Sequence, residues 1–230
     1  MALTVLQDSG EIINEVVQEE KTLSIYNLIM DGGLWGQIII ALLVVLLTLA
    51  LYIYFERFFA IKAASKTDSN FMNQIRDYVS NGKLDSAKVL CAQANSPAAR
   101  LVEKGISRIG KPLADIHTAI ENAGRLEIYK LEKNVSVLAT IAGTAPMLGF
   151  LGTVVGMIVA IHEIANAGGQ IDIKMLSDGL YTAMTTTVAG LIVGIIAYVQ
   201  YNHLVVRTTK VVYEMEAKSV EFLDLLNEPI

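Results

Sequence analysis

Three long stretches of this chain contain no charged side chain, and they limit the folds it can adopt. The uncharged intervals are 24 residues between Asp31 and Glu56, 29 between Lys133 and Glu163, and 28 between Asp178 and Arg207. Roughly 20 apolar residues in a helix cross a hydrocarbon core of about 30 Å, so each interval is long enough to span a membrane. A soluble fold would have to bury all three, and too little chain remains to cover them. We therefore expect an all-α integral membrane protein with three transmembrane helices, at 34–55, 135–161 and 179–206.

Composition excludes several classes of function. Hydrophobic residues make up 53 % of the chain and charged residues 18 %, against about 25 % charged in ordinary soluble domains. The net charge of −5 leaves no basic surplus for nucleic acid, so no nucleic-acid partner is expected. The lone cysteine, Cys91, can form no internal disulfide and has no neighbouring zinc ligands. With no nucleotide loop and no nucleophile–base set visible, we expect a protein that is not an enzyme, with no catalytic residue, metal or cofactor.

The positive charges predict the orientation in the membrane. Of the 18 Lys and Arg residues, 13 lie in 56–134 and three in 207–230, while 1–33 and 162–178 hold one each. Positive charge stays on the cytoplasmic side. The chain is thus predicted to run N-out and C-in, with a periplasmic segment at 1–33 and a periplasmic loop at 162–178. A cytoplasmic helical domain at 56–134 and a cytoplasmic C-terminal helix at 207–230 complete this plan.

The soluble segments show helix starts and stops. In the cytoplasmic domain, Asn81-Gly82 and Gly110-Lys111-Pro112 are predicted breaks, and Ser96-Pro97 is a predicted helix start. No breaker follows Leu113 until Pro146, so one helix is expected to run uninterrupted from the cytoplasm into the second span. No strand pattern of useful length is evident.

Two further helices are expected at the ends of the chain. The third span should continue to Asn227, and a helix over 177–227 would be roughly 75 Å long. Near the N-terminus, residues 8–31 have the spacing of an amphipathic helix that could lie on the outer membrane surface, with a partly ordered tail as the alternative. Membrane lipids are expected partners, because Lys62, Lys66, Arg207 and Lys210 lie where anionic headgroups would meet them.

Small residues set the second and third spans apart from the first, which is built from Leu, Ile and Val. Small residues let membrane helices approach closely, and here they recur every three or four positions. The helix-packing candidates among them are Gly149, Gly152, Gly156, Gly190 and Gly194.

Threonines accompany the small residues in both spans. The pore candidates are Thr153, Thr182, Thr186 and Thr187. A membrane threonine commonly bonds a carbonyl of its own helix, but a cluster at similar depth could also line a polar lumen. No Asp, Glu, Lys or Arg lies inside any span. If the protein conducts protons, a partner must therefore bring the titrating side chain.

Two runs resemble those of a known family. APMLGFLGTVVGMI at 145–158 and TTVAGLIVGIIAYVQYN at 186–202 resemble the second and third spans of the MotA/TolQ/ExbB proton-channel family. Glu56-Arg57, at the inner end of the first span, also fits this family. These two residues could form an inner-mouth ion pair with a neighbouring helix, or a simple membrane-edge pair. The three-span plan resembles ExbB, with TolQ close behind, rather than MotA, which has a fourth span.

The resemblance implies an assembly and a mechanism. Members form homopentamers in the bacterial cell inner membrane that enclose two copies of a single-span partner, ExbD or TolR. The membrane aspartate of that partner accepts the proton, and the work reaches a TonB-like protein or the Tol system. By position, Thr153 and Thr187 match the two pore threonines of the family, and Pro146 and Gly149 match its packing motif. Thr182 stands where some ExbB proteins carry a glutamate.

Four functions remain open from the sequence. The first is an ExbB-like channel subunit that uses the proton motive force to energise TonB-dependent outer-membrane transport. The second is a TolQ-like subunit that serves envelope integrity, and the third is a membrane scaffold that conducts nothing. The fourth is a subunit of a gliding or secretion motor. The scaffold should tolerate valine at Thr153 and Thr187, whereas the channel should not.

Overall fold

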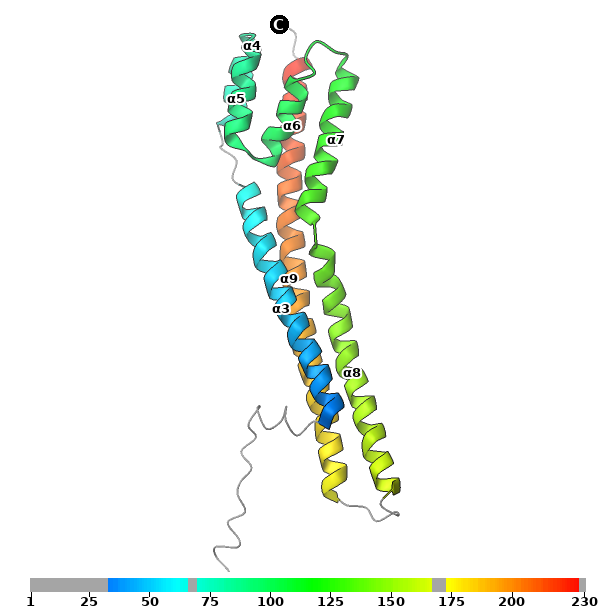
Figure 1. The fold of residues 1–230 in the computed structure, drawn as a ribbon. Coiled ribbons are helices and arrows are strands. Elements are labelled where there is room, and N and C mark those ends of the chain that lie inside the picture. Colours follow the sequence, from blue (N-terminus) through cyan, green and yellow to red (C-terminus); the bar gives the residue numbers. More distant parts are fainter. Residues whose placement is uncertain (1–32, 66–69, 167–172, 228–230) are drawn as a thin grey trace, which may run out of the picture. The chain divides into compact units, whose positions relative to one another are not determined.

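The computed structural model describes residues 33–65, 70–166 and 173–227, and these are helical almost throughout (Figure 1). The helices are α3 (Gly33–Ala64), α4 (Phe71–Ser80), α5 (Leu84–Ala94), α6 (Pro97–Ile106), α7 (Leu113–Glu132), α8 (Val135–Asn166) and α9 (Ile173–Asn227). No strand occurs in the described ranges. Three stretches are long and apolar enough to cross a membrane: Leu34–Ala64, Leu113–Asn166 and Gly179–Asn227. The predictions of an all-helical chain and of three candidate spans are confirmed, while the amphipathic helix expected at 8–31 lies outside the described residues.

The chain divides into two compact units. One unit combines Met1–Ala41 with Leu148–Ala189, and the other combines Leu42–Met147 with Gly190–Ile230. Helices α3, α8 and α9 each contribute to both units. The long α9 is unbroken over its 55 residues, as the sequence predicts.

Helices α4, α5 and α6 lie between the breaks that the local sequence predicts, and α7 begins at Leu113, after the last of these breaks. The Ser96 hydroxyl caps α6 by accepting from the backbone N–H of Ala99 at 3.2 Å, and Pro97 occupies the first helical position. Gly82 and Gly110 have φ angles of +70° and +93°, which glycine adopts without steric cost. The C-terminal end of α9 packs against α6. A Cβ on Gly105 of α6 would lie 2.4 Å from the ring of Phe222, so only glycine admits this contact.

The predicted uninterrupted helix from Leu113 into the second span is wrong. A two-residue link at Lys133 and Asn134 separates α7 from α8 (Figure 1), and Asn134 is left-handed with φ of +62°. Asparagine tolerates this conformation better than most residues, but it also occurs inside helices, so the residue type alone does not predict a break here.

Pro146 lies inside α8, within the span expected at 135–161. Its ring faces a position without a side chain, since a Cβ on Gly194 of α9 would lie 2.6 Å from the Pro146 Cγ. Pro146 has no N–H to donate to the carbonyl of Ala142, one turn earlier in α8. The Ala142 carbonyl oxygen also faces Gly194, since it lies 3.2 Å from the position that a Cβ on Gly194 would take.

A buried carboxylate joins α6 to α7. Glu127 is 5 % exposed and accepts hydrogen bonds from Arg100 at 2.5 Å and from Lys130 at 2.7 Å. The backbone carbonyl of Lys130 in turn accepts from Arg57 of α3 at 3.1 Å. Burial alone would raise the pKa of Glu127, but the hydrogen bonds and charges of Arg100 and Lys130 outweigh it, so the pKa lies below its ordinary value. The ionised form of Glu127 therefore stabilises this part of the fold.

Replacing Glu127 with glutamine should lower the stability of the folded protein by about 1–3 kcal/mol, because two cations lose a charged acceptor. Since the pKa of Glu127 is lowered by folding, the contribution is complete above the ordinary pKa of about 4.3 and disappears as the pH falls through the lowered value. Thermal unfolding in detergent between pH 3 and pH 7, at intervals of about one unit, measures both effects. The acid-induced drop in the midpoint temperature should be smaller in Glu127→Gln than in the wild type.

The matched control is Glu121→Gln, on the same helix. Glu121 pairs with Arg125 at 2.7 Å, but both side chains are largely exposed, so less than about 1 kcal/mol is expected. Equal midpoint shifts in the two variants would contradict a special role for Glu127.

Candidate functional site

Small residues bring α8 and α9 close together in the first unit. A Cβ on Gly152 would lie 2.4 Å from the Thr186 Oγ1, and a Cβ on Gly179 would lie 2.5 Å from the Cβ of Ala160. Both distances are shorter than real Cβ atoms permit, so the two backbones could not approach this closely with a larger residue at either position. We call this contact between α8 and α9 the seam. Gly156 of α8 also lies in it, and a Cβ on Gly156 would be 3.4 Å from the Cβ of Ala183.

This close approach places two hydroxyls of α9 near one carbonyl of α8. The Thr187 hydroxyl donates to the Gly149 carbonyl oxygen at 3.2 Å, and the Thr186 hydroxyl reaches the same oxygen at 3.4 Å. Thr186 is fully buried, whereas Thr187 is half-buried. We call Gly149, Thr186 and Thr187 the carbonyl cluster. It is a polar contact between two helices in stretches that carry no Asp, Glu, Lys or Arg.

The other two threonines predicted to line a pore are not members of the carbonyl cluster, although the Thr182 carbonyl lies 3.3 Å from the Thr186 hydroxyl. Thr153 is half-buried, and its hydroxyl donates to the Phe150 carbonyl of its own helix at 2.6 Å. Thr182 is 9 % exposed and packs toward α3, where its Cγ2 lies 2.8 Å from the position of a Cβ on Gly36. Thr182 and Thr186 thus lie in the interior of the first unit, and Thr153 and Thr187 are the two with partial exposure.

The remaining predicted residues lie in both units. Gly149 and Gly190 are buried, and Gly194 faces Pro146 as described above. Glu56 and Arg57 form an ion pair with each other on α3. Arg57 is only 8 % exposed, and its second interaction is the one with the Lys130 carbonyl.

Sequence reasoning missed a chain of polar contacts between α3 and α9. The His203 ring bonds the Tyr54 hydroxyl through Nδ1 at 2.8 Å and accepts from Arg207 Nε at its Nε2, also at 2.8 Å. Because arginine can only donate, Nε2 is the acceptor, so Nδ1 carries the proton and donates to Tyr54. The Arg207 guanidinium also lies 5.0 Å from the centre of the Phe58 ring, a cation–π contact. Arg207, which the sequence assigned to lipid headgroups, therefore has partners on both helices.

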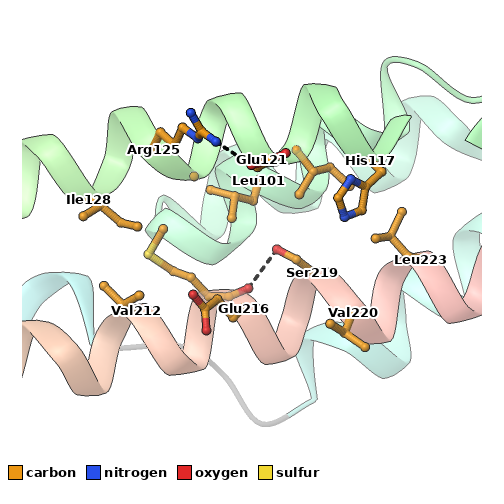
Figure 2. Close-up of a pocket in the computed structure, with 13 residues that line it drawn as sticks. Leu101, His117, Glu121, Arg125, Ile128, Val212, Glu216, Ser219, Val220 and Leu223 are labelled. Carbon is orange, nitrogen blue, oxygen red and sulfur yellow. Dashed lines mark hydrogen bonds and ion pairs between the residues drawn. The ribbon is translucent and has the colours of Figure 1, made fainter. Parts of the chain in front are cut away.

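A hollow of about 340 Å³ lies between α7 and α9 (Figure 2). Most of its lining is apolar and includes Leu101 of α6. Gly124 of α7 also borders the hollow and contributes no side chain. Among its charged residues, Arg125 donates to Glu121 one turn away on the same helix. The hollow lies outside the three uncharged stretches. In the part of the chain that the structure describes, no three His, Cys, Asp or Glu residues gather closely enough to hold a metal ion.

The fold and the carbonyl cluster together define a class: a helical membrane protein with several candidate spans. Two of these spans are joined through hydroxyl–carbonyl contacts, within stretches that carry no Asp, Glu, Lys or Arg. Residues 93–217, more than half of the chain, match the model of the MotA/TolQ/ExbB proton channel family. The chain belongs to this family, which is a family of proton channels rather than of enzymes.

Curated relatives carry the names ExbB and TolQ. The chain is 34 % identical over 102 residues to the biopolymer transport protein ExbB of Aquifex aeolicus, covering 44 % of this chain and 68 % of that protein. It is 28 % identical over 185 residues to the Tol-Pal system protein TolQ of Haemophilus influenzae, covering 73 % and 76 %. An ExbB homologue of Methanothermobacter thermautotrophicus is 26 % identical over 123 residues, and there the match spans 54 % of this chain but only 43 % of the relative.

Replacing Gly152 with alanine should destabilise the protein by about 1–3 kcal/mol, because the new Cβ would meet both the hydroxyl and the Cβ of Thr186. The control is Gly143→Ala on the same helix, where a Cβ would meet nothing within 4 Å. That substitution should leave stability unchanged or raise it slightly, since alanine favours helix more than glycine. Midpoint temperatures in detergent compare the two. A Gly152→Ala protein as stable as Gly143→Ala would show that the seam does not need this glycine.

Proposed function

We propose that this chain is the channel subunit of a bacterial inner-membrane motor, with an ExbB-like role. It forms a homopentamer around two copies of an ExbD-like single-span protein and uses the proton motive force to energise TonB-dependent outer-membrane transport. Membership of the proton-channel family supports the general class. The size of the assembly, the partner and the client system go beyond it and are part of the proposal.

The carbonyl cluster is the observation that carries the proposed mechanism. Thr187 is half-buried, so its hydroxyl can turn from Gly149 toward a water or a carboxylate on the open side of the seam. Burying an ionised carboxylate without hydrogen-bond donors is costly. Threonine hydroxyls lower that cost while adding no fixed charge that would hold the carboxylate permanently ionised. In this scheme Thr187 and Thr153 serve the partner's acid, and the chain itself supplies no group that titrates within the membrane.

The distribution of positive charge supports the orientation in this proposal. Residues 56–134 carry 13 of the 18 Lys and Arg residues. Placing them in the cytoplasm, together with the C-terminal part of α9, satisfies the positive-inside rule. A proton that enters along the seam then gains about 2.3 kcal/mol per 100 mV of membrane potential.

A TolQ-like role is the second candidate, and the extent of the alignments favours it. The match to the Haemophilus influenzae TolQ covers 73 % of this chain, against 44 % for the Aquifex aeolicus ExbB. The two roles share the channel mechanism and differ in partner and client. Deletion of the gene separates them: loss of uptake through TonB-dependent receptors indicates the first, and a leaky, detergent-sensitive outer membrane indicates the second.

Replacing Thr187 with valine should lower proton flux about 10- to 100-fold, because a hydrogen bond to a charged group is lost. Thr153→Val should lower it as well, and Thr187→Ser should retain most of it. The measurement uses the complex purified through an affinity tag on this chain, placed in liposomes with an internal pH dye and driven by a potassium diffusion potential.

The control variant is Thr185→Val, whose hydroxyl in the wild type bonds the Tyr181 carbonyl of its own helix at 2.9 Å. Its flux should equal that of the wild type. Unchanged flux in assembled Thr187→Val complexes would remove the threonines from the mechanism. An assembled wild-type complex without any flux would favour the non-conducting scaffold.

A further inference from the structure

We infer that Thr186 is a positioning residue for proton transfer: its hydroxyl takes over the Gly149 carbonyl whenever the Thr187 hydroxyl turns away to the partner's carboxylate. This inference rests on the proposed channel function and adds a residue that would touch neither the proton nor the carboxylate. The carbonyl cluster would then act as a two-state hydrogen-bond exchange.

The Thr186 hydroxyl has more acceptors than it can serve at once. It lies 2.9 Å from the Ala183 carbonyl, 3.3 Å from the Thr182 carbonyl and 3.4 Å from the Gly149 carbonyl. A hydroxyl has one hydrogen to donate, so the nearest acceptor, on its own helix, holds it in the observed state. The Gly149 oxygen on α8 lies within reach as an alternative.

Burial restricts Thr186 to these acceptors. The residue is 0 % exposed, so its hydroxyl can reach neither a lumen nor a partner chain. It has room beside α8 only because Gly152 has no Cβ. The half-buried Thr187 differs in this respect, since it has an open side.

The exchange conserves hydrogen bonds on the α8 side of the seam. When the partner's carboxylate is ionised, the Thr187 O–H leaves the Gly149 oxygen and donates to a carboxylate oxygen. The Thr186 O–H then leaves the Ala183 oxygen, which remains in the helical ladder, and donates to Gly149. When the carboxylate takes up a proton, it no longer requires the donor, and both hydroxyls return. No covalent bond changes within this chain.

Removing the Thr186 hydroxyl should therefore make it harder for Thr187 to leave Gly149. We expect flux through Thr186→Val complexes to fall about three- to tenfold, a loss typical of one neutral hydrogen bond. The pH of half-maximal flux should move upward by about 0.3–1 unit, because the ionised carboxylate is less well supported and binds its proton at higher pH. Thr186→Ser keeps the hydroxyl and should restore both values.

A role in packing alone predicts the opposite order. Valine has the shape of threonine and serine lacks its methyl group, so a packing residue should tolerate valine better than serine. Thr185→Val again serves as the control for loss of a threonine hydroxyl on α9. If Thr186→Val fails to assemble, Thr186→Ala and Thr186→Ser are compared instead. These two small residues differ only by the hydroxyl, so a difference in flux between them reports its effect.

The same liposome measurement separates the two levels of the account. An assembled wild-type complex without flux would overturn the proposed function, and this inference with it. Unchanged flux in Thr187→Val would leave the channel in place but overturn the threonine mechanism on which this inference rests. Loss of flux in Thr187→Val, combined with a wild-type pH profile in the hydroxyl-free Thr186 variants, would overturn the inference alone. A better-conducting Thr186→Val than Thr186→Ser would overturn it as well.

Discussion

The close approach of α8 and α9 is the contact on which the candidate site depends. Lipid is as apolar as the helices themselves, so spans associate through van der Waals packing and hydrogen bonds rather than through the hydrophobic effect. At Gly152 the missing side chain lets the two backbones meet, and the same approach brings a carbonyl of α8 within reach of the hydroxyls of Thr186 and Thr187. Packing and polar chemistry are thus provided by one set of residues, and a change in either alters the other.

In the proposed channel, a division of tasks follows from the absence of charge in the spans. A fixed cation near the path would hold the partner's acid ionised, and a fixed anion would hold it protonated. Hydroxyls bonded to a backbone carbonyl can instead respond to either state. The chain then contributes positioned donors, and the partner contributes the group that titrates. The ion-paired residues of this chain, such as Glu127 with Arg100, lie outside the three uncharged stretches.

Local signals in the sequence predicted most of the fold but only part of the site. Three uncharged stretches and the Ser96-Pro97 start correspond to observed helices, because hydropathy and capping act over a few residues. The break at Asn134 was missed, since asparagine only permits a left-handed turn.

The directions of Thr185, Thr186 and Thr187 could not be predicted either. Consecutive helical residues point about 100° apart, and only the positions of α3 and α8 decide which of them is buried. Glu127 was missed because a glutamate on a helix is usually solvated, and its burial depends on Arg100 from another helix.

The central claim is that the open side of Thr187 faces water in the assembled complex, and cysteine accessibility tests it most directly. A water-soluble methanethiosulfonate reacts with a thiolate, which forms only where water reaches. The native Cys91 gives little background, because burial and the nearby Glu103 raise the pKa of its thiol to about 12. The account predicts modification of Thr187→Cys but not of Thr186→Cys, because Thr186 is fully buried and points about 100° away around the helix. An assembled complex in which Thr187→Cys stays unmodified would contradict it.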